Sequence, residues 1–319
     1  MAIYLSEDDV RHLLTMPMAL AAVESAHREL AAGTPPAQDT PRARTRLPQT
    51  ALHILHGALP GRGVLGFKAY TSNRSGNRFQ VQLFDAASGE LQAILSADFL
   101  GMMRTGAASG VATRWLARPD AQVAGIFGTG WQAEGHVLAL CAARSWQQIQ
   151  VFGRDPIRQE TFCARLRDLT GAHIVPAHSP EAMVREADVV GTVTTAATAL
   201  FDADWLKPGT HINAAGSNAL IRHELSEASV RKCSLVAVDT VATALAEAGD
   251  LLPLVEKGRL QARQLVELGD IIAGQHPGRR SADEITLFES QGLAVQDLAV
   301  AAEVVALAKE RGLGQPLPF

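Results

Sequence analysis

The chain of 319 residues is poor in cysteine and in aromatic side chains, and neither sign of charge dominates it. Its three cysteines are widely spaced and form no C-x-x-C pair: Cys141, Cys163 and Cys233. An odd and scattered set of this kind argues against a disulfide framework or a zinc ribbon. We therefore expect a protein of the reducing cytoplasm that holds no metal.

Nucleic acid and membrane are not expected as partners either. The formal net charge is −4 with no basic stripe, whereas nucleic-acid binders gather Lys and Arg on one face. The sequence contains no run of about 18 apolar residues of the kind that spans a membrane as a helix. The first residues, MAIYLSEDDVRHLL, carry acids where a signal peptide has basic residues and a long apolar stretch.

The first third of the chain predicts two helices around a set of strands. Residues 6–32 open with a Ser-x-x-Asp capping pattern and continue with apolar residues at helical spacing, which predicts one helix. Residues 50–97 have the pattern of strands, with a hairpin turn over 85–89. The alanine-rich residues 104–117 predict a second helix.

The rest of the chain alternates regularly. Short apolar strands and longer helical segments follow one another over 123–238, which predicts an α/β fold with a doubly wound parallel sheet. Residues 281–312 return to helical periodicity, with no strand nearby in sequence. We expect this tail to pack back on the first part of the chain, and the length predicts two domains.

A glycine motif lies at the start of this alternation. In GIFGTGWQA, residues 125–133, the pattern Gly128-x-Gly130-x-x-Ala133 follows an apolar strand and opens a helix. The first glycine makes a tight turn, the second admits a pyrophosphate, and the third small residue lets the helix pack on the strand. Backbone N–H groups at the helix start supply the donors. The strand–turn–helix context favours a dinucleotide site over a purely structural turn.

The next strand indicates which dinucleotide binds. An acid at its tip favours NAD(H), because a carboxylate bonds the 2′-hydroxyl of the ribose. Here the strand IQVF is followed by Gly153, Arg154 and Asp155. Arg154 is suited to a 2′-phosphate, so NADP(H) is the preferred prediction. NAD(H) stays possible if Asp155 turns inward.

Five stretches in order along the chain resemble the ornithine cyclodeaminase/mu-crystallin family: GFKAYTSNRSGN, LFDAASGELQAILSADFLGMMRTGAASGVATRWLA, GTGWQA, HINAAGSNALIRHEL and DEITLFESQGLAVQD. The resemblance implies a Rossmann domain, residues 116–289, inserted into a smaller α+β domain for substrate binding and dimerisation, residues 1–115 plus 290–319. It implies a homodimer, with the active site in the cleft and the nicotinamide facing the first domain.

The resemblance also implies roles for individual residues. Arg44 matches the family's substrate-carboxylate arginine, although Arg42 or Arg46 would fit if the match slips by two. Lys68 matches its active-site lysine, and Arg104 the arginine that reaches substrate and cofactor. Three cations suit an α-imino or α-amino carboxylate. The cofactor contacts predicted in all are Arg104, Thr105, Gly128, Gly130, Trp131, Gln132, Arg154, Thr194, Ala214, Ala215 and Ser290.

Two departures from the family's cyclodeaminases bear on the reaction. Those enzymes carry an acid/base aspartate where this chain has Asn218, and a lysine where it has Arg222. Asparagine cannot take a proton, but it can hold a water or a substrate nitrogen. Lys68 and Asn218 are therefore the catalytic candidates, and the pattern favours reduction of a preformed imine over loss of ammonia.

The predicted function is an NAD(P)H-dependent reductase of a cyclic imino acid, giving L-proline from Δ1-pyrroline-2-carboxylate or L-pipecolate from Δ1-piperideine-2-carboxylate. Three alternatives stay open. One is an ornithine or lysine cyclodeaminase with retained NAD, and another is an alanine-type amino-acid dehydrogenase. The third is a mu-crystallin-like protein that binds NADPH and a small ligand without turnover as its main role.

Overall fold

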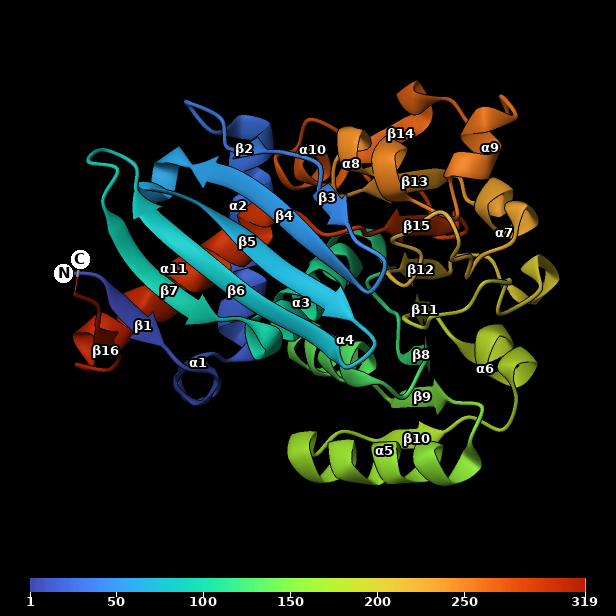
Figure 1. The fold of residues 1–319 in the computed structure, drawn as a ribbon. Coiled ribbons are helices and arrows are strands. Elements are labelled where there is room, and N and C mark those ends of the chain that lie inside the picture. The colour runs from blue at the N-terminus through green and yellow to red at the C-terminus, as the bar shows by residue number, and fades with distance from the viewer. Residues whose placement is uncertain (319) are drawn as a thin grey trace. The chain divides into compact units, whose positions relative to one another are not determined.

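The computed structural model describes residues 1–318 (Figure 1). The chain divides into a first unit, residues 1–104 with the segment from Gly292 to the C-terminus, and a second unit, Thr105–Gln291. The first boundary falls inside a helix, α3 (Asp98–Leu116), between Arg104 and Thr105. The start of α3 belongs to the first unit because the backbone N–H of Phe99 donates to Glu7, at 2.7 Å.

The first unit is built on one mostly antiparallel sheet of eight strands. Their order is β16-β1-β7-β6-β5-β4-β2, and β3 pairs with β4 off this path. The strands are β1 (Ile3–Leu5), β2 (Gln38–Asp39), β3 (Ala43–Arg46), β4 (Thr50–Leu59), β5 (Val64–Asn73), β6 (Gly76–Asp85), β7 (Leu91–Ser96) and β16 (Gln315–Pro316). The predicted strands and the turn after Asp85 are confirmed.

The predicted helix over 6–32 is in fact two helices, α1 (Glu7–Leu13) and α2 (Met16–Ala32). The capping box forms as expected, since Ser6 and Asp9 exchange backbone–side-chain hydrogen bonds. The helix breaks because Leu14 and Thr15 are extended and Pro17, which has no N–H, is tolerated only in a first turn.

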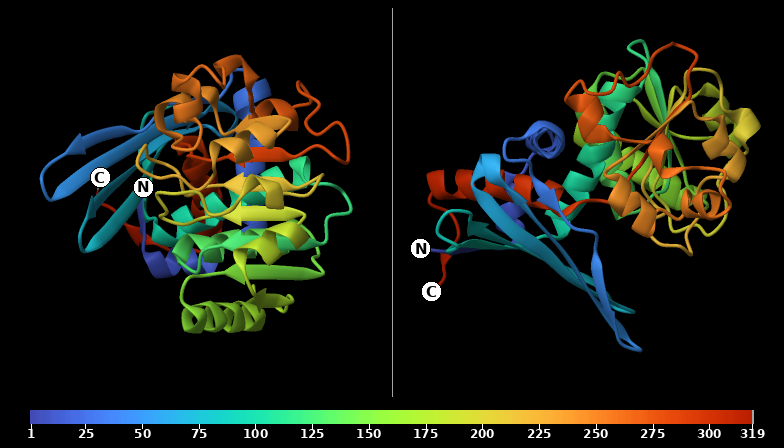
Figure 2. Two further views of the ribbon diagram at one scale, coloured as in Figure 1. Left: turned by 90° about the vertical axis from the view of Figure 1, so that its right-hand side faces the viewer. Right: turned by 90° about the horizontal axis from the view of Figure 1, so that it is seen from above.

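The periodic tail forms α11 (Ala294–Glu310), which packs on strands β4 to β6 and on α2, as expected (Figures 1 and 2). Eleven of its side chains are buried. The prediction that helix begins near 281 was wrong, because Thr286–Glu289 is a strand, β15. Its apolar residues Leu287 and Phe288 have no exposed surface. A run this short has no periodicity that separates strand from helix.

The second unit has the predicted parallel sheet, in the order β10-β9-β8-β11-β12-β15-β13-β14. The strands are β8 (Val123–Phe127), β9 (Gln148–Phe152), β10 (Ile174–Pro176), β11 (Val189–Thr192), β12 (His211–Ala214), β13 (Leu235–Val238), β14 (Leu265–Glu267) and β15. The helices are α4 (Trp131–Ala143), α5 (Pro156–Thr170), α6 (Pro180–Glu186), α7 (Glu227–Lys232), α8 (Val241–Glu247), α9 (Leu252–Glu256) and α10 (Leu268–Ile272).

Both faces of this sheet are buried, as a parallel sheet requires. Ile126 and Val189 pack in one apolar cluster with side chains of α4 and α5. Their neighbours Phe127 and Val190 belong to the cluster on the other face, with side chains of α6 and α7. The carboxyl ends of the strands therefore form one edge, which is where ligands bind in sheets of this type. Within residues 1–318, no helix combines the length and apolar character of a membrane span.

Candidate coenzyme and substrate sites

The glycine motif has the geometry that a pyrophosphate needs. Gly128 has a φ of +123°, and a Cβ there would lie 3.0 Å from the carbonyl oxygen of Val193. Gly130 caps α4 with no side-chain hydrogen bond, and a Cβ there would meet nothing within 4 Å. Ala133 is fully buried against the turn. The helix start is thus open to an anion, with Trp131 and Gln132 in its first turn.

After the end of β9, Arg154 is exposed and Asp155 is engaged in capping the next helix, α5. The Asp155 carboxylate caps α5, accepting hydrogen bonds from the backbone N–H groups of Ile157 and Arg158 at 2.9 and 3.1 Å. An acid held in this way is less free to bond a ribose hydroxyl. A Cβ on Gly153 would lie 2.7 Å from the Thr129 side chain, so a larger residue at this position would require Thr129 to move.

The structure gathers four further predicted coenzyme residues of this unit at one sheet edge, whereas Thr105 lies on α3. β8, β11, β12 and β15 are neighbours in parallel register. Thr194 follows β11, Ala214 ends β12 and Ala215 follows it. Ser290 follows β15 and donates to the Asp239 carboxylate at 2.9 Å. Since these strands point the same way, the four residues lie on the edge that also carries the glycine turn.

Asn218 lies in the loop after β12, half-buried, and its Oδ1 accepts a hydrogen bond from Arg222 at 3.4 Å. The two residues that depart from the cyclodeaminase pattern therefore contact each other. An amide beside a guanidinium holds no removable proton near neutral pH. The contact supports the view that this position orients a water or a substrate nitrogen and does not act as a base.

Two of the three cationic candidates of the first unit, Lys68 and Arg104, meet around one buried acid, Asp297 of α11. Its Oδ1 accepts from Lys68 Nζ at 2.9 Å and from Arg104 Nε at 3.0 Å. Lys68 and Arg104 are 3 and 7% exposed, and Asp297 is fully buried. Gln296 accepts a further bond from Arg104 at 3.1 Å. A buried charge needs a partner of this kind, so Asp297 allows both cations to be buried.

Sequence reasoning missed Asp297. A signal existed, since a single charged residue stands in the otherwise uncharged stretch LAVQDLAV of a buried helix. Acids are almost never fully buried unless paired, so such a residue predicts a cation elsewhere in the chain. Two glycines make room for the cluster. A Cβ on Gly101 would lie 3.1 Å from Lys68 Nζ, and one on Gly292 would lie 2.3 Å from Arg104.

The environment of Lys68 lowers its pKa to about 8. Burial is the main cause, because it disfavours the charged amine. Asp297 opposes this effect, whereas Arg104 and Arg42 add to it by repulsion. The Lys68 ammonium also lies 5.1 Å from the centre of the Phe79 ring. An amine with a pKa near neutral is suited to donate a proton.

Arg42 lies immediately before β3, and Arg44 and Arg46 lie in it. Side chains two residues apart in a strand point to the same face, so the three arginines share one face. Arg42 and Arg44 are half-buried, and Arg46 is exposed. Arg44 pairs in register with His53 of β4, whose ring stacks on Tyr70. Burial, with repulsion from all three arginines, lowers the pKa of His53 to about 4. Arg42 is near enough to lower the pKa of Lys68 by repulsion, so Arg42 stays a candidate for the carboxylate beside Arg44.

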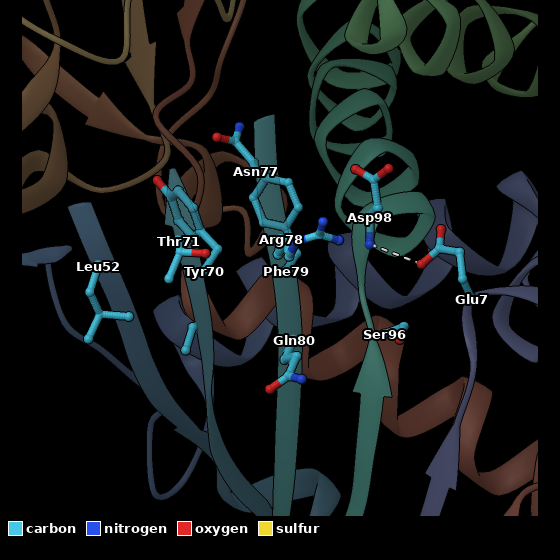
Figure 3. Close-up of a pocket in the computed structure, with 11 residues that line it drawn as sticks. Glu7, Leu52, Tyr70, Thr71, Asn77, Arg78, Phe79, Gln80, Ser96 and Asp98 are labelled. Carbon is cyan, nitrogen blue, oxygen red and sulfur yellow. Dashed lines mark hydrogen bonds between the residues drawn. The ribbon is translucent and has the colours of Figure 1, made fainter. Parts of the chain in front are cut away.

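A pocket of about 550 Å³ opens beside this region of the first unit (Figure 3). Its lining includes Leu52, Tyr70 and Phe79, and the last two rings lie 4.8 Å apart. The pocket reaches Glu7 and Asp98 at the starts of α1 and α3. None of the predicted site residues lines it. We therefore do not assign it to the substrate.

Comparison with known sequences identifies the family. The sequence model of the ornithine cyclodeaminase/mu-crystallin family matches residues 2–312. The chain belongs to this family. It is 35% identical over 326 aligned positions to a Δ1-pyrroline-2-carboxylate reductase of Bacillus cereus, with 99% of each chain covered.

Solved structures agree with this placement in the ornithine cyclodeaminase/mu-crystallin family. A Thermococcus litoralis Δ1-pyrroline-2-carboxylate reductase in complex with NADH and L-proline is 30% identical, with a TM-score of 0.93 over 99% of this chain and all of that one. An archaeal alanine dehydrogenase dimer with bound NAD is 28% identical, with a TM-score of 0.92 over all of this chain and 99% of that one. The α/β architecture with a Rossmann-type parallel sheet is thus that of the family.

Proposed function

We propose that the protein is an NAD(P)H-dependent reductase of a cyclic imino acid, converting Δ1-pyrroline-2-carboxylate to L-proline or Δ1-piperideine-2-carboxylate to L-pipecolate. The observation that carries the proposal is the buried Lys68–Asp297–Arg104 cluster, which offers a proton and a carboxylate partner together. The relatives support it, since the one from Bacillus cereus is named for this reduction and that from Thermococcus litoralis was solved with NADH and L-proline.

The second unit would hold the coenzyme, whose reduced nicotinamide supplies a hydride to the imine carbon when bound. The turn at Gly128 and Gly130 fits a pyrophosphate because it exposes the start of α4. The site would be completed by Thr105, Trp131, Gln132, Thr194, Ala214, Ala215 and Ser290.

The first unit would bind and protonate the imino acid. Arg104, with Arg44 or its neighbour Arg42, would hold the substrate carboxylate by charge-assisted hydrogen bonds. Lys68 would donate its proton to the imine nitrogen as the C=N bond becomes CH–NH. Its pKa of about 8 leaves it mostly protonated at neutral pH yet able to release the proton. Asn218 would orient the nitrogen or a water beside it.

A continuous assay of coenzyme absorbance tests the reaction, with each of the two imines offered to NADH and NADPH separately. We expect oxidation with at least one pair and isolation of the L-amino acid. Lys68→Ala is expected to keep coenzyme binding and to lose turnover by about 100-fold or more, the scale of general acid catalysis. Unchanged turnover in this variant would refute the role of Lys68.

The same assay separates the alternatives. Ammonia released from ornithine or lysine without added coenzyme would indicate a cyclodeaminase, and pyruvate with ammonia as substrates would indicate an alanine-type dehydrogenase. Tight coenzyme binding with no turnover on either imine would indicate a binding protein. The pairing of Asn218 with Arg222, in place of an acid and a lysine, favours reduction over deamination.

We propose NADP(H) as the preferred coenzyme, with NAD(H) as the alternative. The support is the exposed Arg154 beside a β9 tip whose acid is used to cap α5. Arg154→Ala is expected to weaken NADPH binding about tenfold or more, since a hydrogen bond to a charged group contributes about 1.5–3 kcal/mol. NADH binding should change less than about twofold. Equal losses for both coenzymes would refute this role.

We also propose a cytoplasmic homodimer. The related archaeal alanine dehydrogenase is described as a dimer. The first unit carries exposed apolar residues on neighbouring strands, Leu52 and Leu65, which are 40 and 38% exposed. Sedimentation equilibrium should give twice the chain mass of 33.9 kDa. A mass of one chain at micromolar concentration would refute the dimer.

A further inference from the structure

Glu224 is a fully buried acid that no step of the proposed reaction uses. It lies six residues after Asn218, in the segment that returns from the sheet edge of the second unit. One oxygen accepts from the backbone N–H and the hydroxyl of Thr194, at 2.6 and 2.7 Å. The other accepts from the backbone N–H of Gly216 at 2.8 Å. A single carboxylate thus joins the loops that follow β11 and β12.

The main chain that carries this carboxylate is itself held by hydrogen bonds. The backbone N–H groups of Glu224 and Leu225 donate to Asp250 at 2.8 and 3.1 Å. The Glu224 carbonyl accepts from the N–H of Leu200 at 2.9 Å. Burial raises the pKa of Glu224, while the donors from Thr194 lower it by favouring the carboxylate. The main chain of Glu224 is thus fixed by hydrogen bonds, and its carboxylate accepts three more from Thr194 and Gly216. The side chain can therefore set the spacing of the two loops.

The next residue of the β12 loop is held in a similar way. Ser217 donates its hydroxyl to the buried carboxyl of Glu289, which also accepts from Gln291 at 3.0 Å. The loop is therefore fixed at Gly216 and at Ser217 by acids of two different segments. Ala215, a proposed coenzyme contact, directly precedes Gly216. Asn218, a proposed catalytic residue, directly follows Ser217.

We propose that Glu224 is a positioning residue that holds the loops after β11 and β12 in the shape that receives the coenzyme. The inference rests on the proposed coenzyme site, because Thr194, Ala214 and Ala215 are its members there. The residue acts through its hydrogen bonds to the loop backbone and touches neither substrate nor reacting atoms.

We call the hydrogen bonds of the Glu224 carboxylate to Thr194 and Gly216 the clamp. Two variants disrupt it, one by changing the acid and the other by changing the loop after β12. Glu224→Gln keeps the size of the side chain but replaces one accepting oxygen with an NH₂ group. That group is itself a donor, so it cannot accept the hydrogen bond from Thr194 or Gly216. Gly216→Ala keeps the acid, yet its Cβ would lie 2.3 Å from the Glu224 carboxylate and 2.5 Å from the Thr194 carbonyl oxygen. The matched control is Glu227→Gln, an acid three residues later that pairs with Arg259 at the surface.

The measurement is the dissociation constant of NADH and NADPH by fluorescence titration of the full-length chain, at a temperature where each variant is folded by circular dichroism. Both clamp variants are expected to weaken coenzyme binding about tenfold or more, the effect of losing one hydrogen bond to a charged group. The control should stay within about twofold, as an exposed ion pair contributes little. At saturating coenzyme, kcat should fall while the KM for the imine is unchanged.

A lower melting temperature with unchanged dissociation constants in both variants would show a purely structural role and overturn the proposal. Should Glu224→Gln fail to fold, Gly216→Ala gives the same test with the acid intact. The outcome is separate from that of the proposed reaction. If the wild-type chain binds coenzyme but reduces neither imine, the reaction is refuted and the clamp is still judged by its dissociation constants. If the wild-type chain binds no coenzyme, both fail.

Discussion

Replacing Asp297 by asparagine isolates the charge that governs Lys68. Asparagine has the same shape and keeps an oxygen for Lys68 and Arg104, so the geometry of the cluster should survive. What is lost is the negative charge that favours the ammonium form. An opposite charge at this distance raises the pKa of an amine by about 1 to 3 units, so the pKa of Lys68 in the variant should lie below the wild-type value of about 8.

The effect on rate follows from the fraction of Lys68 that is protonated. At about pH 7.5 a group of pKa 8 is about three-quarters protonated, whereas one lowered by a single unit is about one-quarter protonated. The value of kcat/KM should therefore fall about threefold for one unit and about 25-fold for two. Because protonation is required, activity is lost as pH rises through the pKa and returns when the pH is lowered. If the lowering is one or two units, the variant should recover at least about half of the wild-type value near pH 6.

The assay is the pH profile of kcat/KM for imine reduction in both enzymes, so that titration of the substrate itself is common to the two. Glu303→Gln is the matched control, because it removes an acid of the same helix that pairs with Arg62 near the surface. Its profile should coincide with that of the wild type. A profile for Asp297→Asn that drops uniformly at all pH values, with its basic limb unmoved, would refute the assignment of that limb to Lys68.

Three further predictions concern binding and stability. Gly128→Ala should weaken coenzyme binding and cost about 1–3 kcal/mol of strain, because its φ of +123° suits glycine and a Cβ would approach Val193; calorimetry of binding checks this. Arg44→Ala should raise the KM for the imine about tenfold without changing coenzyme affinity, and the same result for Arg42→Ala alone would move the role by two residues. Asp188→Ala should lower the free energy of unfolding in urea by about 2–3 kcal/mol, since its carboxylate accepts four hydrogen bonds and ion pairs near β8.

Local rules accounted for much of the fold because they depend on neighbours in sequence. The Ser6 cap, the turn after Asp85 and the strand–helix alternation are set by backbone propensity and by apolar periodicity. The same rules failed where the chain changes direction without a strong signal. Residues 6–32 break at Leu14, and 286–289 enters the centre of the parallel sheet between β12 and β13.

The candidate sites divide in the same way. A glycine turn between a strand and a helix is a local feature, so Gly128 and Gly130 could be assigned from the sequence, and Lys68 and Arg104 from motifs of a family to which the chain belongs. Their coenzyme and substrate roles stay predictions. Asp155 also illustrates a limit, since only the structure shows that its carboxylate caps a helix.

The sequence by itself determined the α/β class, the dinucleotide motif and the family, because these follow from periodicity and from short ordered patterns. Only the tertiary structure decided which acid meets Lys68 and which acid joins the coenzyme loops. Asp297 is 229 residues from Lys68 along the chain, and Glu224 is 30 residues from Thr194. A buried charge must find its partner wherever packing brings one, and no local pattern records that choice.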